Sequence, residues 1–323
     1  MRWERVSRLT SIPARRLAVA AFVIVATPLL GAPLLLAQPV TLELWHGITA
    51  ADRSGLEAMI EAFNREHEGR ILVRATATPW GELYDKIVIA VASGTAADLG
   101  IIHRDRLPDH VLGGLLQPFD DRLLREFGLD EADFLPGVLQ EGRLQGRQYG
   151  IPLDIHPVAL YYDINAVEEA GLVGPPEDPQ TFLDYARKLT ADRDGDGNVD
   201  RWGTWFPVWA PQFHTVVSQM GGRYFGGPGF KEVWVTRPPV RHALQYVWDL
   251  IYSHKVAPPP SLPIDMFRGD ASLVVSGTWW IPLVQDLRAQ GVLDLRLARA
   301  DGVYGSVELA ATAGSHHFVL FTR

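Results

Sequence analysis

Apolar runs of strand length alternate with segments of helical periodicity in the first part of the chain. The runs are residues 40–45, 71–75 and 99–102, and between them apolar side chains recur at helical spacing over 56–63 and 83–91. This β-α-β-α-β order predicts a parallel sheet with right-handed crossovers. In such sheets, ligands bind beyond the carboxyl ends of the strands.

A polar break separates two apolar strands near the middle of the chain. Residues 149–153 and 158–162 are predicted strands, with Asp154, Ile155 and His156 between them, and a capped helix is expected to follow. Two such strands are typical of a chain that passes from one lobe to another. Beyond this point the pattern is richer in helices. The predicted elements there are helices over 182–189, 216–220 and 240–251, and strands over 271–276, 295–299 and 314–321.

Polar and aromatic side chains gather at the predicted strand ends. They are His46, Trp80, His103, Asp105, Arg106, Asp154 and His156. A carboxylate or guanidinium can bind neighbouring sugar hydroxyls through two charge-assisted hydrogen bonds. Asp105 and Arg106 could equally form a surface ion pair that contributes little, and a single histidine in a turn is often a structural hydrogen-bonding group. All seven residues are therefore candidates for ligand contact.

Tryptophan is concentrated in the second half of the chain, where seven of the ten tryptophans lie between residues 202 and 280. The flat C–H face of a pyranose packs on an aromatic ring while polar side chains bind its hydroxyls. Trp279 and Trp280 follow a predicted strand in a turn that contains glycine, and Trp205 and Trp209 lie in a loop that contains proline. We expect these four to contact a ligand, the alternative being a place in the core.

An acidic motif occupies residues 192–200. Its oxygen donors stand at loop positions 1, 3, 5, 7 and 9, with Gly197 at position 6, as in a calcium-binding loop. The donors are Asp192, Asp194, Asp196, Asn198 through its backbone carbonyl, and Asp200. Position 12, normally a bidentate glutamate, is Gly203. The motif indicates either a weak structural Ca²⁺ site or an acidic surface turn, and the sequence requires no other cofactor.

Other signatures of chemistry are few. His316 and His317 are adjacent in a predicted strand, so they point to opposite faces and cannot chelate one metal ion together. The sequence has no nucleophile elbow, P-loop, His-Glu-x-x-His motif or complete dinucleotide-binding fingerprint. A glycosidase needs only two carboxylates about 5–10 Å apart. A secreted glycoside-active enzyme is therefore one possible function, and a protein that only binds its ligand is the other.

The N-terminus has the layout of a secretory signal. Arginines precede the apolar run 17–36, and the small residue Ala37 follows it. The run is long enough to span a bilayer, so an uncleaved anchor is the alternative, although Pro28 and Pro33 interrupt it and favour cleavage. The chain has no cysteine, which excludes disulfides and a lipid attached through cysteine. We expect a periplasmic or extracellular protein that is not a lipoprotein.

Length and charge narrow the class further. A chain of 323 residues suggests about two domains. The formal net charge is −8, and no basic stripe offsets it. Nucleic acid is therefore not an expected partner.

An ordered series of motifs resembles the extracellular solute-binding proteins of ABC importers, specifically the carbohydrate-binding, maltose-binding-protein-like family 1 cluster. The motifs include LELWHG, WGELYDKIVIAVASG, GRQYGIPLDIHPVALYYD, FRGDASLVVSGTWW and AGSHHFVL. The resemblance implies an α/β, two-lobed periplasmic-binding-protein fold of type II. In that fold a ligand cleft lies between the lobes and closes by hinge motion. Family members carry no catalytic residues and pass their ligand to a membrane permease.

The resemblance also implies how the chain is divided. We expect a signal peptide at 1–37, an N-terminal lobe at 38–153, a second lobe at 154–308 and a strand returning to the first lobe at 309–323. Family chains usually continue beyond this strand, so we expect the family's C-terminal part to be absent. The implied ligand contacts are His46, Asp105, Arg106, His156, the Trp205–Trp209 loop and Trp279.

We therefore expect an exported, monomeric binding protein for a sugar or oligosaccharide, or for a polyol phosphate. Its partner would be the transmembrane subunits of an ABC permease. Besides the enzyme, a calcium-dependent adhesion or structural module is a further alternative.

Overall fold

The computed structural model describes residues 39–48, 52–206, 210–262 and 264–322. The expected signal peptide at 1–37 and Trp209 lie outside these residues. The remainder belongs to one compact unit built on two separate sheets. The sequence-based expectation of an α/β protein is confirmed.

The first sheet has the strand order β2-β1-β3-β15-β4, and β7 pairs with β15. Its strands are β1 (Val40–His46), β2 (Ile71–Ala77), β3 (Leu99–His103), β4 (Leu116–Gln117), β7 (Gly150–Pro152) and β15 (His316–Phe321). β1 is parallel to β2 and β3, as the alternating pattern predicts. β15 runs antiparallel to β3, β4 and β7, so the complete sheet is mixed.

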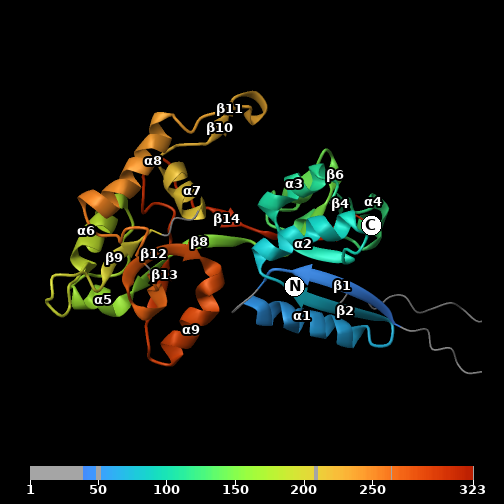
Figure 1. Ribbon diagram of the computed structural model, residues 1–323, viewed down its shortest axis with the longest axis horizontal. Helices are drawn as coiled ribbons and strands as arrows, with labels where there is room; N and C mark the ends of the chain where they lie inside the picture. Colours follow the sequence, from blue (N-terminus) through green and yellow to red (C-terminus); the bar gives the residue numbers. More distant parts are fainter. Residues whose placement is uncertain (1–38, 49–51, 207–209, 263, 323) are drawn as a thin grey trace, which may run out of the picture. The chain divides into compact units, whose positions relative to one another are not determined.

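Helices cover both faces of this sheet (Figure 1). They are α1 (Arg53–Glu66), α2 (Trp80–Ala92), α3 (Leu107–Leu112) and α4 (Asp121–Glu126). Successive residues of a strand point to opposite faces. Ile101 of β3 accordingly packs in a core with Leu56 of α1, whereas Ile102 packs in another core with Ile87 of α2.

Several short elements complete this half: one 3₁₀ turn follows β3, and the others lie between α3 and β7. They are the 3₁₀ turns η2 (Arg104–Arg106), η3 (Glu131–Asp133) and η4 (Leu139–Gly142), and the small hairpin of β5 (Arg143–Leu144) and β6 (Arg147–Gln148). The predicted strand 149–153 is shorter in the structure, where β7 ends at Pro152.

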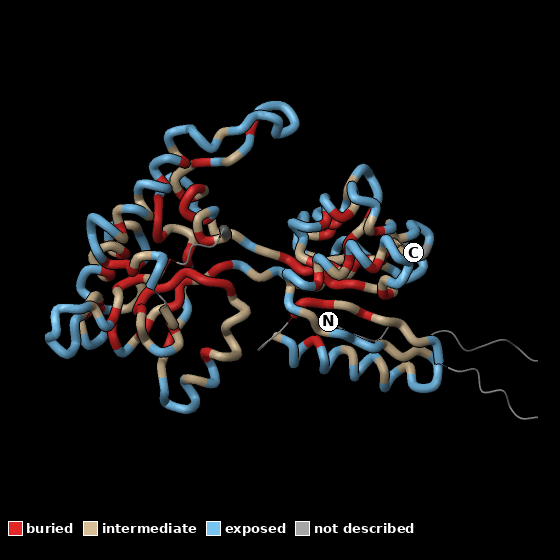
Figure 2. Tube along the Cα trace, viewed as in Figure 1, coloured by how far each residue is buried: buried red, intermediate tan, exposed pale blue. Residues whose placement is uncertain are grey.

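The second sheet has the order β13-β8-β12-β9, with β14 paired to β8. Its strands are β8 (His156–Asp163), β9 (Trp202–Trp205), β12 (Ala271–Gly277), β13 (Leu295–Ala298) and β14 (Ala313–Gly314). All residues of β12 are buried, and this central strand lies within the buried part of the trace in Figure 2. Such burial on both faces explains the apolar run Leu273, Val274 and Val275 at its centre.

Helices and turns complete this half. They are α5 (Ile164–Glu169), α6 (Pro179–Leu189), α7 (Ala210–Gln219), α8 (Pro238–Trp248), the π turn η6 (Asp249–Ser253), η7 (Met266–Arg268), η8 (Thr278–Trp280) and α9 (Ile281–Ala289), with the hairpin of β10 (Phe225–Gly226) and β11 (Glu232–Val233) joined by η5 (Pro228–Phe230). The expected capped helix is α5, because the Asp163 carboxylate accepts the backbone N–H groups of Asn165 and Ala166.

The expected helix over 240–251 differs in detail from its sequence-based prediction. The helix changes from α to π geometry at Asp249. Leu244 is 63% exposed, whereas Val240, Ala243 and Leu250 are buried. The buried stripe of this helix is thus narrower than its apolar sequence suggests.

The chain passes between the sheets along two neighbouring crossings. The outward crossing is residues 153–156 and the return crossing is residues 313–316. Gly314 pairs with His156, and the backbone N–H of Leu153 donates to the carbonyl of His316 at 2.8 Å. The expected boundary at residue 154 lies in the outward crossing.

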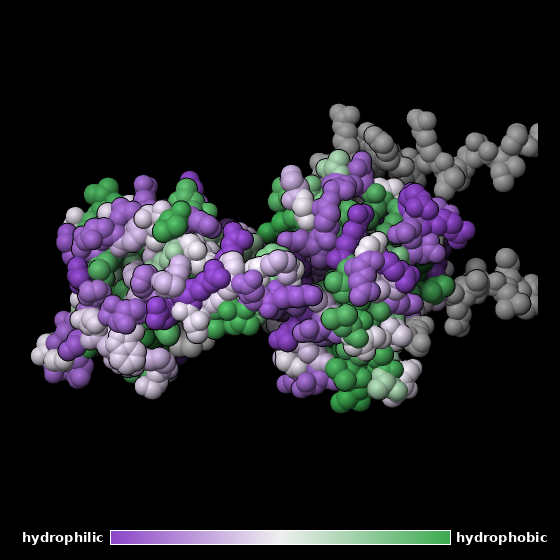
Figure 3. Space-filling model, turned by 90° about the horizontal axis from the view of Figure 1, so that it is seen from above, coloured by the Kyte–Doolittle hydropathy of each residue, from purple (hydrophilic) through white to green (hydrophobic). Residues whose placement is uncertain are grey.

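The exposed surface is mixed in character. Large apolar side chains such as Phe127, Val307 and Leu309 are exposed, and the face seen in Figure 3 carries apolar patches separated by hydrophilic residues. Among the described residues, no helix combines the length and the apolar character needed to cross a bilayer.

Candidate functional site

A cavity of about 790 Å³ lies where the crossings join the strand ends. Its wall includes residues of both sheets and of the elements that follow them. Among the lining residues are Asp52, Trp80, Tyr84, His103, Asp105, Arg106, His156, His214, Trp279, Trp280, Ser315 and His316. This volume is in the range of small-molecule binding sites.

Seven of the sequence-predicted residues line this cavity: Trp80, His103, Asp105, Arg106, His156, Trp279 and Trp280. They converge because β3, α2, β8 and β12 all present an end there. Asp105 and Arg106 occupy the η2 turn directly after β3 and are exposed. Trp279 and Trp280 occupy η8 directly after β12. The structure thus brings charged groups and aromatic rings from distant parts of the chain to one opening.

Three predicted residues are placed elsewhere. His46 is only 1% exposed and does not line the cavity. It lies on the same face of β1 as Leu44, which packs in a core with Leu56 of α1. Asp154 is not among the residues that line the cavity but bonds to two that are, His156 and His316. Trp205 lines a neighbouring cavity of about 370 Å³, which shares Trp279 and Trp280 with the main one.

Sequence reasoning missed several lining residues, among them Asp52, Tyr84, His214 and His316. Tyr84 follows Trp80 by four residues on α2, and this spacing puts both rings on one helix face. Asp52 follows the carboxyl end of β1, where a ligand contact is expected in a parallel sheet. His214 and His316 give no comparable signal, since their positions depend on how the second half of the chain folds.

Aromatic rings form much of the wall. The Trp80 ring is stacked on the His316 ring, with centroids 5.2 Å apart and an interplanar angle of 6°. Gly47 permits this placement, because a Cβ atom there would lie 2.2 Å from the Trp80 ring. A second pair of rings in the wall is His156 and Trp279, which meet edge-on with their centroids 5.6 Å apart.

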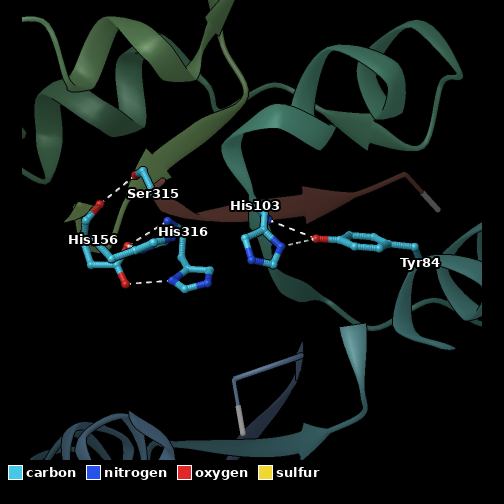
Figure 4. Close-up of polar contacts among 6 residues, drawn as sticks. Tyr84, His103, His156, Ser315 and His316 are labelled. Atoms are coloured by element: carbon cyan, nitrogen blue, oxygen red, sulfur yellow. Dashed lines mark hydrogen bonds and ion pairs between the residues drawn. The ribbon is translucent and has the colours of Figure 1, made fainter. Parts of the chain in front are cut away.

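His103 and Tyr84 form a polar pair in the wall (Figure 4). The Tyr84 hydroxyl lies 2.6 Å from His103 Nδ1, and its oxygen accepts the His103 backbone N–H. Burial lowers the pKa of His103 to about 4 and raises that of Tyr84 to about 12. Both groups are therefore neutral near pH 7, and the pairing favours a His103 tautomer with its proton on Nε2.

Asp154 joins the two crossings. Its carboxylate accepts the His316 backbone N–H at 2.8 Å and lies 2.7 Å from His316 Nδ1 and 3.2 Å from His156 Nδ1. Burial opposes ionisation of this carboxyl, but the hydrogen bonds from the two histidines outweigh that effect and hold its pKa below the usual range. Figure 4 shows His156 and His316 among the groups of this network.

Comparison with known proteins identifies the family. Residues 47–288 match the model of the bacterial extracellular solute-binding proteins. The chain belongs to this family. Similar curated proteins include a binding protein of Brucella abortus, 32% identical over 42% of this chain and 32% of its own length. Another is the arabinooligosaccharide-binding protein of Halalkalibacterium halodurans, which is 28% identical over 62% of this chain and 44% of its own length. The chain thus spans less than half of the length of these relatives.

Solved structures give the fold of this solute-binding protein. An ABC substrate-binding protein of Listeria monocytogenes in complex with cycloalternan superposes with a TM-score of 0.73. It is 20% identical and covers 88% of this chain and 71% of its own. The maltose/maltodextrin-binding domain of Bdellovibrio bacteriovorus bound to maltotriose gives 0.72, with 22% identity and coverage of 87% and 71%. The expected two-lobed periplasmic-binding-protein fold is confirmed.

The acidic loop of this solute-binding protein connects α6 to β9, and none of its residues lines the cavity. Asp192, Asp194 and Asp200 each offer an oxygen, and these atoms lie within 4.8 Å of one another. The Asp192 carboxylate accepts backbone N–H groups of Gly195 and Gly197, which lowers its pKa. Asp196 is engaged by Asn198 instead. Position 12, Gly203, lies inside β9 and supplies no side-chain ligand.

Proposed function

We propose that this protein captures a sugar or oligosaccharide outside the cytoplasm and delivers it to an ABC importer. The observation that carries the proposal is the single cavity that combines the Trp80 and Trp279 rings with the charged side chains of Asp105 and Arg106. Aromatic faces suit the C–H face of a pyranose, and the charged groups suit its hydroxyls. Membership of the solute-binding family supports the same function.

The size of the site favours more than one sugar ring. The neighbouring cavity of about 370 Å³ shares the Trp279 and Trp280 wall and adds Trp205. Its aromatic lining would extend the ligand surface past the first cavity. An arabinooligosaccharide-binding relative and neighbours bound to maltotriose and cycloalternan support an oligosaccharide.

Intrinsic fluorescence tests this function directly, because Trp80, Trp279 and Trp280 line the cavity. We expect a saturable change in tryptophan emission with at least one member of a panel of mono- and oligosaccharides. A panel of glycerophosphodiesters and short peptides is the matched control. Saturation only with the control panel, and no response to any sugar, would contradict the assignment.

Chromogenic glycosides separate binding from hydrolysis. We expect the protein to leave them intact, in keeping with a family of binding proteins. Release of the chromophore that depends on Asp52 or Asp105, the acidic residues of the cavity wall, would favour the enzymatic alternative instead.

Three further features belong to the proposal. The mature protein would be exported by an N-terminal signal at 1–37, which mass spectrometry of the periplasmic fraction tests. It would act as a monomer, which light scattering of the purified chain tests. Its permease partner would be the transmembrane subunits of an ABC importer, which sugar uptake in a deletion strain tests.

A structural Ca²⁺ at the 192–200 loop is the one ion we assign to the proposed function. The clustered oxygens of Asp192, Asp194 and Asp200 suit a hard cation. The missing ligand at position 12 would leave the affinity weak, about 10⁻⁴–10⁻³ M as in extracellular modules. The ion would serve to hold the loop between α6 and β9.

A further inference from the structure

Three potential metal ligands meet where the two crossings run side by side. They are Asp154 on the outward crossing, His156 at the start of β8 and His316 at the start of β15. Each offers one ligand atom, and these atoms lie within 4.8 Å of one another. The outward crossing thus supplies two donors and the return crossing one. A site of this kind exists only in the folded chain, because the third donor comes from a distant part of the sequence.

The orientation of each ring is set by its surroundings. Both histidines turn Nδ1 toward the Asp154 carboxylate, at 3.2 Å for His156 and 2.7 Å for His316. The opposite nitrogen of His156 faces Gly314, where a Cβ atom would lie 2.2 Å from Nε2. The two Nδ1 atoms and the carboxylate oxygens are therefore the donors that converge.

Backbone and hydroxyl contacts hold the carboxylate in place. The His316 backbone N–H donates to Asp154 Oδ1 at 2.8 Å, and the Ser315 hydroxyl donates to the Asp154 backbone carbonyl at 2.6 Å. Supporting hydrogen bonds of this type orient the first ligands of metal sites. The Trp80 ring stacks on the His316 ring and limits its rotation.

Burial and charge also suit a cation. The side chains of His156 and His316 are 13% and 11% exposed, and both line the large cavity. Imidazole binds a metal ion in its neutral form, so the three ligands together would carry one negative charge. Asp52, also in the wall, interacts electrostatically with all three groups. Imidazole nitrogen with one carboxylate is a donor set that first-row transition ions prefer.

We propose that Asp154, His156 and His316 bind a divalent transition-metal ion of the Zn²⁺ type, in exchange for the hydrogen bonds between them. Three protein ligands leave a further coordination position, as in open zinc sites, and the cavity lies on the side where a water or ligand oxygen could take it. This site is independent of the sugar assignment and of the 192–200 loop. Binding would join the two crossings through one ion.

Cobalt absorption tests the site without reference to sugar. The full-length chain, freed of metal with EDTA and exchanged into chelator-free buffer, is titrated with Co²⁺ and then with Zn²⁺. We expect ligand-field absorption that saturates near one equivalent and is displaced by Zn²⁺. The variants Asp154→Asn and His316→Ala should each weaken Co²⁺ binding by at least about tenfold. Gly314→Ala should also weaken it, because the added Cβ displaces the His156 ring without removing a donor.

Matched controls make the result decisive. His242→Ala removes an exposed imidazole from α8, and Asp194→Asn removes a carboxylate from the acidic loop. Both should keep the wild-type Co²⁺ affinity within about twofold. Circular dichroism checks folding, and if His316→Ala does not fold, the milder Asp154→Asn decides. Absence of saturable Co²⁺ absorption in the wild type overturns the proposal. So does wild-type affinity in Asp154→Asn, or loss of the signal in Asp194→Asn.

Discussion

The indole ring of Trp80 lies parallel to the imidazole ring of His316, with the two centroids 5.2 Å apart. Trp80 is the first residue of α2, and His316 is the first residue of β15. The contact therefore joins an early helix start to the end of the return crossing. It makes one wall of the cavity depend on two segments that are far apart in the sequence.

Truncating Trp279 should weaken sugar binding more than truncating an exposed tryptophan. Trp279→Ala removes an aromatic wall of the cavity, and such contacts contribute about 0.5–1.5 kcal/mol beyond their buried area. We expect the dissociation constant for the best sugar to rise about tenfold or more, as measured by calorimetry. Trp248→Ala is the control, since Trp248 is 55% exposed on α8. Equal losses in both variants would contradict the role of Trp279.

Gly47 should tolerate no side chain. A Cβ atom there would lie 2.2 Å from the Trp80 ring, so Gly47→Ala must displace an aromatic side chain of the wall. We expect a loss of about 1–3 kcal/mol in the free energy of unfolding, measured with urea.

Gly55→Ala is the matched control for this change. Gly55 lies in α1, and a Cβ atom there would meet nothing within 4 Å. Alanine has the higher helix propensity, so this variant should be as stable as the wild type or more stable. The same destabilisation in both variants would show that Gly47 has no special constraint.

Acid should destabilise the protein in part through His46. Burial lowers the pKa of His46, so the folded state keeps the ring neutral while the unfolded state takes up a proton below its ordinary value of 6.5. Stability is therefore lost as the pH falls below about 6.5, at no more than about 1.4 kcal/mol per pH unit for one proton. Urea midpoints at pH 7 and pH 5 should differ less in His46→Gln than in the wild type. An unchanged difference would exclude His46 as a source of the pH dependence.

Calcium should raise the thermal stability through the acidic loop. We expect millimolar Ca²⁺ to raise the melting temperature of the EDTA-treated protein and Asp192→Asn to abolish the increase. Asp184→Asn, which changes an exposed carboxylate on α6, should leave it intact. Equal increases in all three proteins would indicate a general salt effect.

The sequence predicted the regular elements well, because their apolar patterns are local. The strands 71–75 and 271–276 and the helix beginning near Phe182 all occur within a few residues of their expected ends. The helix over 240–251 was less accurate, since its apolar residues exceed the face that the core can bury.

The cavity was predictable only in part. Trp80, Asp105 and Trp279 lie in the short segments that follow β2, β3 and β12, and parallel strands carry ligands at their carboxyl ends. His46 has the same local pattern but is buried, because the fate of a strand-end side chain depends on what packs over it. His316 was considered only together with His317, whose side chain faces the other side of the strand, and was not predicted to line the cavity. Its approach to Asp154 depends on the pairing of two crossings, which no local pattern encodes.

β15 sits between β3 on one side and β4 and β7 on the other. Until residues 316–321 have been synthesised, the first sheet has an unfilled slot at its centre, and β3 has no partner along that edge. Native pairing must then span most of the sequence, which slows folding. A nascent chain of this design would keep its first sheet loosely structured until β15 has been made.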